Sequence, residues 1–431
     1  MRPYANLAAV TSRPEPGSHR TLRLACYGWV NETAGSGPTA HYLLVRELLR
    51  RGVKVDLFAH DDHVPCPAGL VGDGFRYFGL EQPGLLTLVD KLPSPLVTVI
   101  RRLSYPAIVA AWRRTYSPVV ESEHRRAPYD AVLVLDTLPA FMIPGVPTVA
   151  WIQAPLHTEL EAARRLRPQI VSVSGRIFYL VLVSVSRYTI LVRRRALASC
   201  DQLIQGSEWA RRALVDAGIS PDAVHVVPYP VDLDLFQPDP GINPDWEQPV
   251  LLSLGRLDPR KRLDLLLEAF GLVRQAVPGA RLRVIGRPGY APNQLSLIDQ
   301  SPHREQIEYR PLMPREEIPA LLRGADVLVQ TSENESFGSA VAEALASGVP
   351  VVVGPSNGTA DYVDTNSQVF ESYAPESVAH AILRALEARR KRPDDVRQST
   401  RASAERWFAA PAIADQVLEI LNATTGSRET R

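Results

Sequence analysis

The first half of the chain alternates short apolar runs with longer amphipathic stretches. The apolar runs that we predict to be strands span 22–27, 53–59, 131–135 and 147–152. Pro38 suits the first position of a helix that we expect between the first two strands, ending before Gly52. Segments 82–128 and 156–198 are expected to be helical but less regular. Near-continuous runs rich in branched residues, separated by helices, predict a parallel sheet covered on both faces.

The alternation restarts after a segment rich in Pro and Asp, 226–246, which we interpret as an interdomain linker. The strands predicted beyond it span 250–254, 281–285, 306–309, 326–330 and 351–353, and the helices span 263–275, 318–322 and 338–347. A last helix near 412–421 follows Trp407 and is expected to cross back onto the first unit. The predicted fold class is therefore α/β, with two Rossmann-like domains in tandem.

The domain limits follow from these elements. We expect a disordered tail at 1–20, an N-terminal domain at 21–228 that is completed by 405–425, and a C-terminal domain at 229–404. Ligands of open α/β sheets bind at the carboxyl ends of the strands. Two such domains facing each other predict a site in the cleft between them.

Composition narrows the function classes. The 431 residues include 48 Lys+Arg and 47 Asp+Glu, so no overall charge favours nucleic acid as a partner. Three widely spaced cysteines offer neither a disulfide framework nor metal-ligand spacing, which fits a reducing compartment. Residues 1–20 lack the apolar stretch of a secretory signal, and no later run reads as a clean membrane span. We therefore expect a cytoplasmic protein, in peripheral contact with a membrane at most.

The carboxylates Glu335 and Glu343 lie eight residues apart, on the loop after a predicted strand and inside the next predicted helix. Gly338 between them lets a ligand approach the backbone, and the free N–H groups of a helix start suit an anion. Glu343 can accept hydrogen bonds from both hydroxyls of a ribose, whereas a surface position or an ion pair is its alternative. The segment predicts a site for a phosphorylated, hydroxyl-rich ligand.

A basic run at 255–262 follows the predicted strand 250–254 and precedes a helix. Arg256 can fork onto phosphate oxygens, and Lys261 supplies a second cation. A nucleotide diphosphate that departs with growing charge needs such neutralisation. A solvated basic turn is the alternative, but the place of the run at a strand end favours phosphate binding.

Two weaker signals lie in the first half of the chain. Gly35 and Gly37 lie between the first strand and its helix and resemble a phosphate-cradling turn, with a flexible turn as the alternative. Gln153 and His157 follow the strand 147–152. We expect His157 either to contact a sugar or acceptor or to lie on the surface.

These motifs together resemble a family 4 glycosyltransferase of the GT-B fold, within the glycosyl transferases group 1 class. The resemblance is strongest over 201–365 and weaker over 22–60. It implies retaining transfer of a hexose-type sugar from a nucleotide diphosphate sugar, with UDP or GDP as the expected nucleotide. The acceptor would be a hydroxyl of a glycan, a lipid-linked molecule or a small molecule. No metal and no other cofactor would be needed.

The resemblance also implies roles for individual residues. Arg256, Lys261 and Glu335 would be the catalytic residues, with Arg256 and Lys261 on the diphosphate and Glu335 on the hexose. Glu343 would bind the ribose, so the two carboxylates would grip opposite ends of the donor rather than form an acid/base pair. The other implied donor contacts are Gly35, Gly37, Gly255, Arg287, Arg310, Leu312, Ser336, Phe337, Gly338 and Ser339. The departing phosphate would assist deprotonation of the acceptor.

The chain departs from the family pattern at three places. Many members have Asn-Gly where this chain has Tyr229-Pro230, and adjacent glycines where it has Gly-Ser-Gly. Many have a histidine that contacts the donor sugar where Gln153 stands. Either Gln153 or His157 would then supply the contact with the sugar or acceptor.

Other classes stay open at this point. Another GT-B enzyme, such as a phosphorylase or an epimerase, is one, and a non-catalytic protein that binds a nucleotide sugar is another.

The acceptor is expected on the first domain. There the segment 171–195 mixes apolar side chains with arginines. A buried core helix with basic ends is the favoured interpretation, and docking on an anionic membrane or a lipid-linked acceptor is the alternative. The sequence leaves the oligomeric state open.

Overall fold

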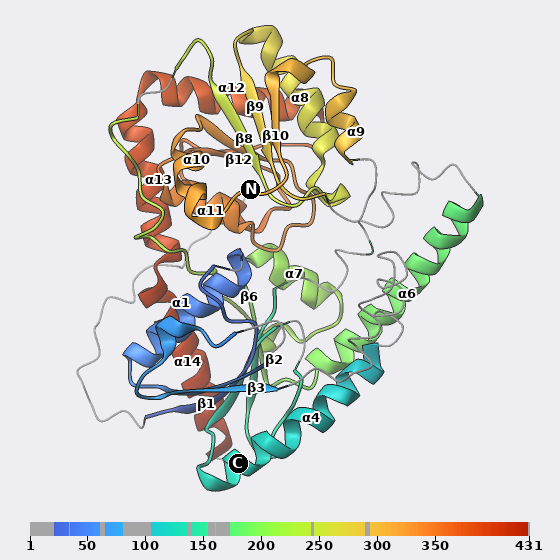
Figure 1. Cartoon of the computed structure of the whole chain (residues 1–431), viewed down its shortest axis with the longest axis vertical. Helices are drawn as coiled ribbons and strands as arrows, with labels where there is room; N and C mark the ends of the chain where they lie inside the picture. Colours follow the sequence, from blue (N-terminus) through green and yellow to red (C-terminus); the bar gives the residue numbers. More distant parts are fainter. Residues whose placement is uncertain are drawn as a thin grey trace.

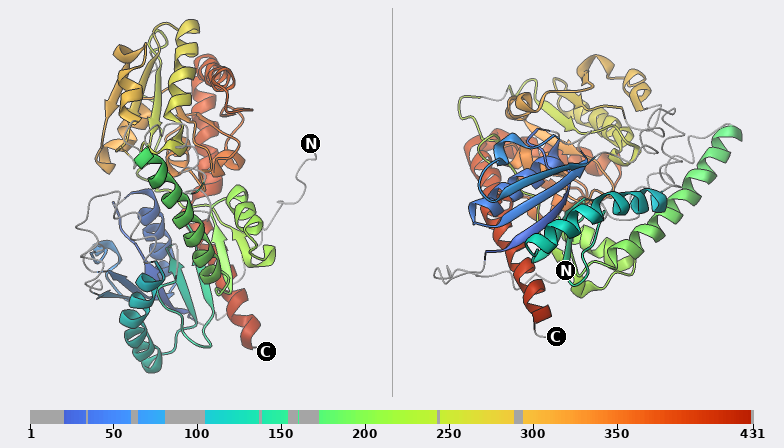
Figure 2. Two further views of the ribbon diagram at one scale, coloured as in Figure 1. Left: turned by 90° about the vertical axis from the view of Figure 1, so that its right-hand side faces the viewer. Right: turned by 60° about the horizontal axis from the view of Figure 1, so that its bottom comes forward.

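The computed structural model describes residues 21–33, 35–60, 65–80, 105–136, 139–153, 160, 173–242, 245–288 and 294–429. They form two α/β units stacked along the long axis of the molecule (Figure 1), and two further views show the same stacking (Figure 2). The tail expected at 1–20 lies outside the described residues.

The first unit contains seven parallel strands in the order β3-β2-β1-β4-β5-β6-β7. Their bounds are β1 (Arg23–Gly28), β2 (Lys54–His60), β3 (Phe75–Leu80), β4 (Ala131–Leu135), β5 (Thr148–Trp151), β6 (Gln202–Gln205) and β7 (Val224–Val226). The helices are α1 (Ser36–Arg50), α4 (Tyr105–Arg126), α6 (Val173–Leu197) and α7 (Glu208–Asp216), with short 3-10 turns at Ala68–Leu70 and Pro221–Ala223. Helices α4, α6 and α7 cover one face of the sheet through Tyr116, Leu197 and Leu214.

The second unit contains six parallel strands in the order β10-β9-β8-β11-β12-β13. Their bounds are β8 (Val250–Leu254), β9 (Arg281–Ile285), β10 (Ile307–Arg310), β11 (Val327–Gln330), β12 (Val351–Val353) and β13 (Gln368–Val369). The helices are α8 (Leu263–Ala276), α9 (Gln294–Asp299), α10 (Ile318–Arg323), α11 (Ser339–Ala346), α12 (Pro375–Lys391), α13 (Pro393–Phe408) and α14 (Ala410–Glu429). Short 3-10 turns lie at Pro259–Lys261, Arg304–Gln306, Arg315–Glu317 and Gly358–Tyr362.

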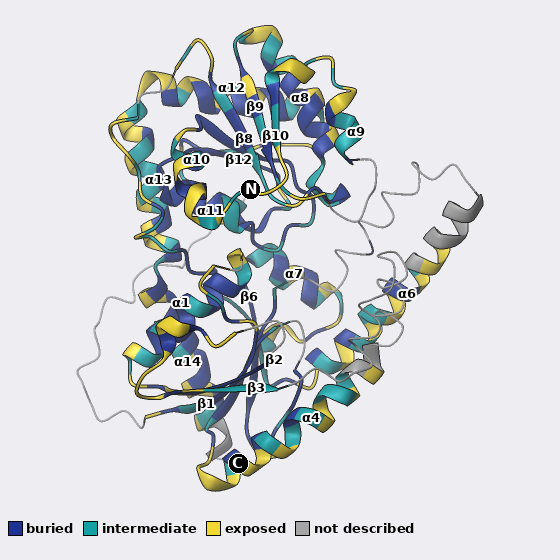
Figure 3. Ribbon diagram, viewed as in Figure 1, coloured by how far each residue is buried: buried dark blue, intermediate teal, exposed yellow. Residues whose placement is uncertain are grey.

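The predicted fold class of two parallel α/β units is confirmed, and burial explains which elements the apolar pattern revealed. Every residue of β4, β11 and β12 is buried, so these strands read as continuous apolar runs. Strand β3 buries only Phe75 fully, and β13 has two residues, so neither was predicted. Strands β6 and β7 and helices α9, α12 and α13 were also not predicted. Figure 3 shows that the buried positions follow the sheets and the faces of the helices that pack on them.

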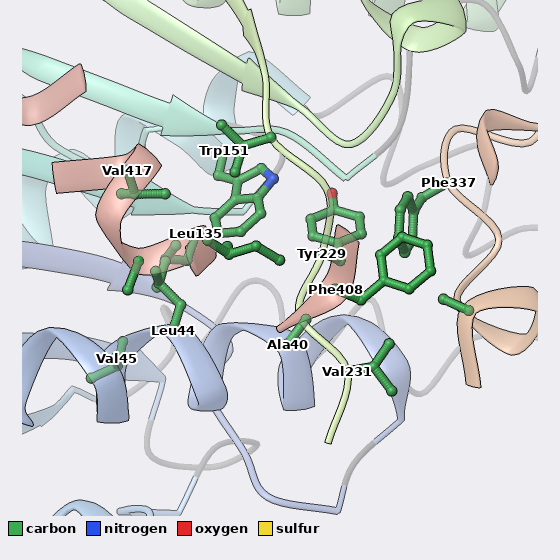
Figure 4. Close-up of a cluster of buried hydrophobic side chains, with 14 of the residues drawn as sticks. Ala40, Leu44, Val45, Leu135, Trp151, Tyr229, Val231, Phe337, Phe408 and Val417 are labelled. Carbon is green, nitrogen blue, oxygen red and sulfur yellow. The ribbon is translucent and has the colours of Figure 1, made fainter. Parts of the chain in front are cut away.

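An aromatic cluster joins the two units. Phe337 is 2% exposed, and its ring lies edge-on to Tyr229 at 5.0 Å and to Phe408 at 5.6 Å between ring centroids. Tyr229 in turn stacks on Trp151 of β5 at 5.1 Å. Figure 4 shows these four side chains meeting between the two units. The core is therefore continuous across the boundary, and Phe337 is its member from the segment 335–343, called here the acidic motif.

The chain crosses between the units twice, and the two crossings lie side by side. The N–H of Val231, in the linker, donates to the carbonyl of Phe408 at the end of α13. Helix α14 then returns to the first unit, where Arg51, directly after α1, donates to Asp415 at 2.8 Å and to the carbonyl of Pro411 at 2.7 Å. The last helix thus crosses back onto the first unit, as predicted.

Removing the Phe337 ring is expected to weaken the join between the units. Phe337→Ala leaves a cavity among Tyr229 and Phe408 and should cost about 3–5 kcal/mol of unfolding free energy. Urea and thermal unfolding monitored by circular dichroism measure the loss. The control is Val71→Ala, at a position that is 69% exposed, where the expected change stays within about 0.5 kcal/mol. Equal losses in the two variants would contradict the role given to Phe337.

Candidate functional site

The candidate site lies where the connections that follow the two central strands of the second sheet lead to opposite sides of that sheet. Strands β8 and β11 are hydrogen-bonded neighbours, yet their following helices pack on opposite faces, α8 in one apolar cluster and α11 in the other. Such a switch point leaves a crevice at the carboxyl ends of the strands. The basic run follows β8 and the acidic motif follows β11, so the topology brings the two motifs together.

The two motifs meet in an ion cluster of Glu335, Lys261 and Arg260. Glu335 Oε2 accepts from Lys261 Nζ at 2.5 Å and from Arg260 Nη1 at 2.7 Å. All three side chains are at most 25% exposed. Burial raises the pKa of Glu335, but the two cations more than offset it and hold its pKa at about 2. Burial lowers the pKa of Lys261, and Glu335 only partly offsets that. Glu335 is therefore ionised, and its charge is already balanced within the site.

Backbone conformation and close packing fix the two loops that carry the basic run and the acidic motif. Arg262 has a left-handed conformation with φ of 52°, which ends the 3-10 turn that carries Lys261 and starts α8. The hydroxyl of Thr331, just after β11, donates to the carbonyl of Lys261 at 2.9 Å. Gly338 has φ of 91°, and a Cβ there would lie 2.8 Å from Asn357 Oδ1 and 2.9 Å from Gln330 Oε1. Only glycine fits this turn into α11.

Glu343 has a protein partner. Its Oε1 accepts from Arg315 Nη1 at 3.2 Å, and both side chains are nearly buried. The ion pair that the sequence left as an alternative is therefore present, and a contact of Glu343 with a ribose stays a prediction. Burial raises the pKa of Glu343, and Arg315 opposes that rise. The guanidinium of Arg315 also lies 5.3 Å from the Phe236 ring centroid, which ties this pair to the linker.

The residues after Glu335 point to different places. Phe337 is buried in the aromatic cluster between the units, so its backbone rather than its ring is available to a ligand. Ser336 Oγ donates to the main-chain oxygen of Gln153 at 2.7 Å, and the Ser336 carbonyl accepts from Ser207 Oγ at 2.7 Å. Ser339 is the first residue of α11, one turn before Glu343. The acidic motif is thus bound to the carboxyl edge of the first sheet.

Four other predicted donor contacts are exposed, and two of them pair with acidic residues outside the ion cluster. The side chain of Arg256 is 65% exposed and pairs with buried Asp258 at 2.6 Å. Arg310 is exposed and pairs with Glu308 at 2.6 Å, Leu312 is 57% exposed, and Arg287 is exposed. Their contacts with a nucleotide stay predictions.

The glycines and the polar residues of the other loops complete the predicted set. Gly255 has φ of 144°, and a Cβ there would lie 3.6 Å from Lys261 Nζ. Gly35 precedes α1 with φ of 107°, and a Cβ there would meet nothing within 4 Å. A Cβ on Gly37 would lie 3.0 Å from Gln153 Nε2. His157 lies outside the described residues.

Three residues of the site were not predicted as such. Arg260 lies inside the basic run and Ser207 inside the stretch 201–365 where the family resemblance is strongest, so the sequence could have indicated both. Arg315 belongs to a short turn 28 residues before Glu343, and no local pattern marks the pair.

Among the described residues, no His, Cys, Asp or Glu side chains gather in threes or more as metal ligands would. Within the same residues, no helix has both the length and the apolar character of a membrane span.

Two family models divide the chain between them. One, described as Glycosyltransferase Family 4, matches residues 39–235. The other, described as Glycosyl transferases group 1, matches residues 239–403. The chain belongs to the family 4 glycosyltransferases. The family resemblance expected from the motifs is thereby confirmed.

Curated relatives share parts of the chain. The D-inositol 3-phosphate glycosyltransferase of Thermomonospora curvata is 29% identical over 265 residues, which are 56% of this chain and 60% of the relative. That of Geodermatophilus obscurus is 34% identical over 48% of this chain and 49% of the relative. A GDP-mannose-dependent alpha-(1-6)-phosphatidylinositol monomannoside mannosyltransferase of Mycobacterium tuberculosis is 28% identical over 45% of this chain and 55% of the relative. The chain spans about half the length of the curated relatives it matches.

Solved structures share the whole fold. Sucrose-phosphate synthase from Thermosynechococcus elongatus superposes with a TM-score of 0.69 at 18% identity, covering 94% of this chain and 100% of that chain. Anabaena HepE, solved in complex with UDP-glucose, gives a TM-score of 0.63 at 17% identity, covering 93% and 100%. At such identities the likeness concerns the fold alone, and it confirms the predicted GT-B arrangement for this family 4 chain.

The Arg315–Glu343 pair gives a pH-dependent prediction. Arg315→Ala leaves a carboxylate buried without its cation and should cost about 3–5 kcal/mol of unfolding free energy near pH 8. Burial already raises the pKa of Glu343, and loss of the cation raises it further, so the carboxyl takes up a proton as the pH falls. The deficit relative to wild type should therefore shrink toward about pH 5, as urea unfolding at several pH values would measure.

A matched control separates charge from packing. Adding Glu343→Gln to Arg315→Ala removes the uncompensated charge, so the double variant should recover much of the stability at high pH. A deficit that is constant with pH, or no recovery in the double variant, would contradict the pairing.

Proposed function

We propose that this chain is a retaining glycosyltransferase that moves a hexose from a nucleotide diphosphate sugar to a hydroxyl acceptor. The observation that carries the proposal is the buried cluster of Glu335, Lys261 and Arg260 at the switch point of the second sheet. Two cations and the start of α11 lie together there, which suits the diphosphate of a donor. Family membership and the likeness to a protein solved with UDP-glucose support the same function.

The proposed reaction assigns a task to each group. The bond between the anomeric carbon and the phosphate oxygen breaks, and the acceptor oxygen bonds to the same face of that carbon. The departing phosphate oxygen takes the acceptor proton, so no separate general base is required. Lys261 and Arg260 balance the charge that grows on the diphosphate, and this stabilises the transition state more than the ground state. Glu335 would hold hexose hydroxyls, and Glu343 would hold the ribose.

A panel of nucleotide sugars tests the proposal. A ligand that binds only the folded protein raises its melting temperature, so the shift should identify base and sugar together, with UDP and GDP sugars expected to respond. Release of UDP or GDP from the responding donor then reports turnover with acceptors. Phosphate-dependent activity without nucleotide would favour a phosphorylase instead. Binding without release or transfer to any acceptor would favour a non-catalytic protein.

Lys261→Ala is expected to lower turnover with the responding donor by about 100-fold to 1,000-fold, because one of the two cations at the leaving diphosphate is lost. Glu335 keeps its pair with Arg260 in this variant, so the fold should persist. Initial rates and circular dichroism measure the two effects. Lys391→Ala, which removes an exposed surface cation, is the control and should retain full activity. Unchanged turnover in a folded Lys261 variant would contradict the role of Lys261 at the leaving diphosphate.

The acceptor side of the proposal concerns α6. Leu180 is 63% exposed, Tyr188 40% and Leu191 44%, so the favoured interpretation of a buried core helix is wrong for this face. Arg187, Arg194 and Arg195 are exposed on the same helix and fall at helical spacing with these residues. The exposed stretch along α6 is visible at the side of the molecule (Figure 3). We infer that this face, called here the α6 face, docks on an anionic membrane that carries a lipid-linked acceptor.

Vesicle flotation tests the α6 face. The protein should float with vesicles that contain phosphatidylglycerol but not with phosphatidylcholine alone, and added salt should weaken the association because screening reduces the attraction of the arginines. Leu180→Ser combined with Leu191→Ser should reduce flotation several-fold, since each buried methylene contributes about 0.8 kcal/mol. Val71→Ser, at an exposed apolar position away from α6, is the control. Equal flotation of the α6 variant and wild type would refute the docking surface.

A further inference from the structure

A chain of three polar groups runs through the buried edge of the first unit. His41, on α1, is fully buried beside the stacked rings of Trp151 and Tyr229, with centroids 6.3 Å and 6.5 Å away. Its Nδ1 lies 2.9 Å from the main-chain oxygen of Trp29, in the loop after β1. Its Nε2 lies 3.4 Å from Nε2 of Gln153, in the loop after β5. This series of polar groups therefore ends at Gln153, beside the acidic motif.

The carbonyl of Trp29 fixes the tautomer of His41. A carbonyl oxygen only accepts, so Nδ1 carries the hydrogen and Nε2 of the neutral ring is an acceptor. Burial lowers the pKa of His41 to about 4, with the Trp29 hydrogen bond opposing this in part, so the ring stays neutral at physiological pH. The groups that face it are the Trp29 carbonyl, the Gln153 amide and two aromatic rings, none of them charged at that pH.

The tautomer in turn fixes the amide of Gln153. An acceptor at His41 Nε2 requires the NH2 end of the amide to face it, so Oε1 faces the other way. Among the described residues, the hydrogen bond to His41 is the one that reaches this side-chain amide. The amide lies against Gly37, where a Cβ would be 3.0 Å from Nε2 and 3.2 Å from Oε1. Gly37 thus makes room for Gln153, which gives this glycine a role apart from phosphate binding.

The backbone of Gln153 holds this residue next to the acidic motif. Its main-chain oxygen accepts from Ser336 Oγ at 2.7 Å, and Ser336 directly follows Glu335. The side chain is half-buried, at the junction of the two units. A free amide oxygen there can accept a hydrogen bond but cannot take a proton.

We propose that His41 is a positioning residue that holds Oε1 of Gln153 toward the cleft, where it accepts a hydrogen bond from a hydroxyl of the donor sugar. Gln153 thus recognises a hydrogen-bond donor on the ligand. The hydrogen bonds from the Trp29 carbonyl through His41 to the amide determine that its oxygen, an acceptor, faces the ligand. This inference rests on the proposed function for the identity of the ligand. The tautomer and the amide orientation do not depend on it.

The first test needs no ligand. Nitrogen-15 spectra of histidine-labelled protein should show His41 with a protonated Nδ1 and a bare Nε2, without titration between about pH 5.5 and 8. His41→Phe removes the signal and assigns it. Gln153→Glu places a carboxylate against Nε2 and should draw a proton onto the ring, which then titrates at a higher pH. An Nε2-protonated tautomer, or titration near the ordinary histidine value in wild type, would overturn the proposal.

The second test measures sugar recognition with UDP-glucose and GDP-mannose against UDP and GDP. Gln153→Leu and His41→Phe should each weaken the better sugar nucleotide about 10-fold relative to its bare nucleotide, the effect of one lost hydrogen bond. Binding of the bare nucleotide should stay within about 2-fold, which a general loss of folding would not allow. His380→Phe, at an exposed position on α12, is the matched control.

The outcomes separate the two proposals. Equal sugar preference in His41→Phe and wild type, with Gln153→Leu impaired, would refute the positioning role alone. If none of the four nucleotides binds the folded wild type, the proposed function fails and the spectra still decide the state of His41.

Discussion

The burial of Phe337 between the two units is the constraint on which the candidate site depends. Three successive side chains leave the same loop in different directions. Glu335 meets Lys261 and Arg260, Ser336 meets the first sheet, and Phe337 enters the aromatic cluster. Because a buried ring of this size cannot move without opening a cavity, the position of the carboxylate follows from apolar packing. The geometry of the candidate site is thus a consequence of how the two units pack.

Electrostatics makes the site ready for a charged ligand without leaving it unbalanced. Glu335 holds two cations and Glu343 holds one, and all are largely buried. An isolated buried charge is costly, so these pairs let the cations remain in the crevice before a diphosphate arrives. A donor that brings phosphates to Lys261 and hydroxyls to Glu335 replaces one set of partners with another. The free energy of binding is then the difference between two well-paired arrangements, and precise placement matters more than the number of charges.

The sequence predicted what local patterns encode. Strands such as β4, β11 and β12 were found because all of their residues are buried, and the cation Lys261 was found because it follows a strand end. Strand β3 escaped because an edge position leaves most of its residues partly exposed. Arg315 escaped because its meeting with Glu343 depends on the path of the chain between them. The α6 face was misjudged because apolar content alone does not say which side of a helix the protein covers.

The two halves of the site differ in how they are built, and this bears on what each can recognise. On the second unit, the cations and carboxylates come from loops that adjacent strands of one sheet fix directly. On the first unit, the contacts with Ser336 come from the hydroxyl of Ser207 and the main-chain oxygen of Gln153, so the Gln153 side chain takes no part in them. The amide of Gln153 instead contacts the buried ring of His41, which we propose sets its direction. In the proposed function, recognition of the nucleotide is therefore tied to the fold, whereas recognition of the sugar depends on a few side chains that other side chains hold in place.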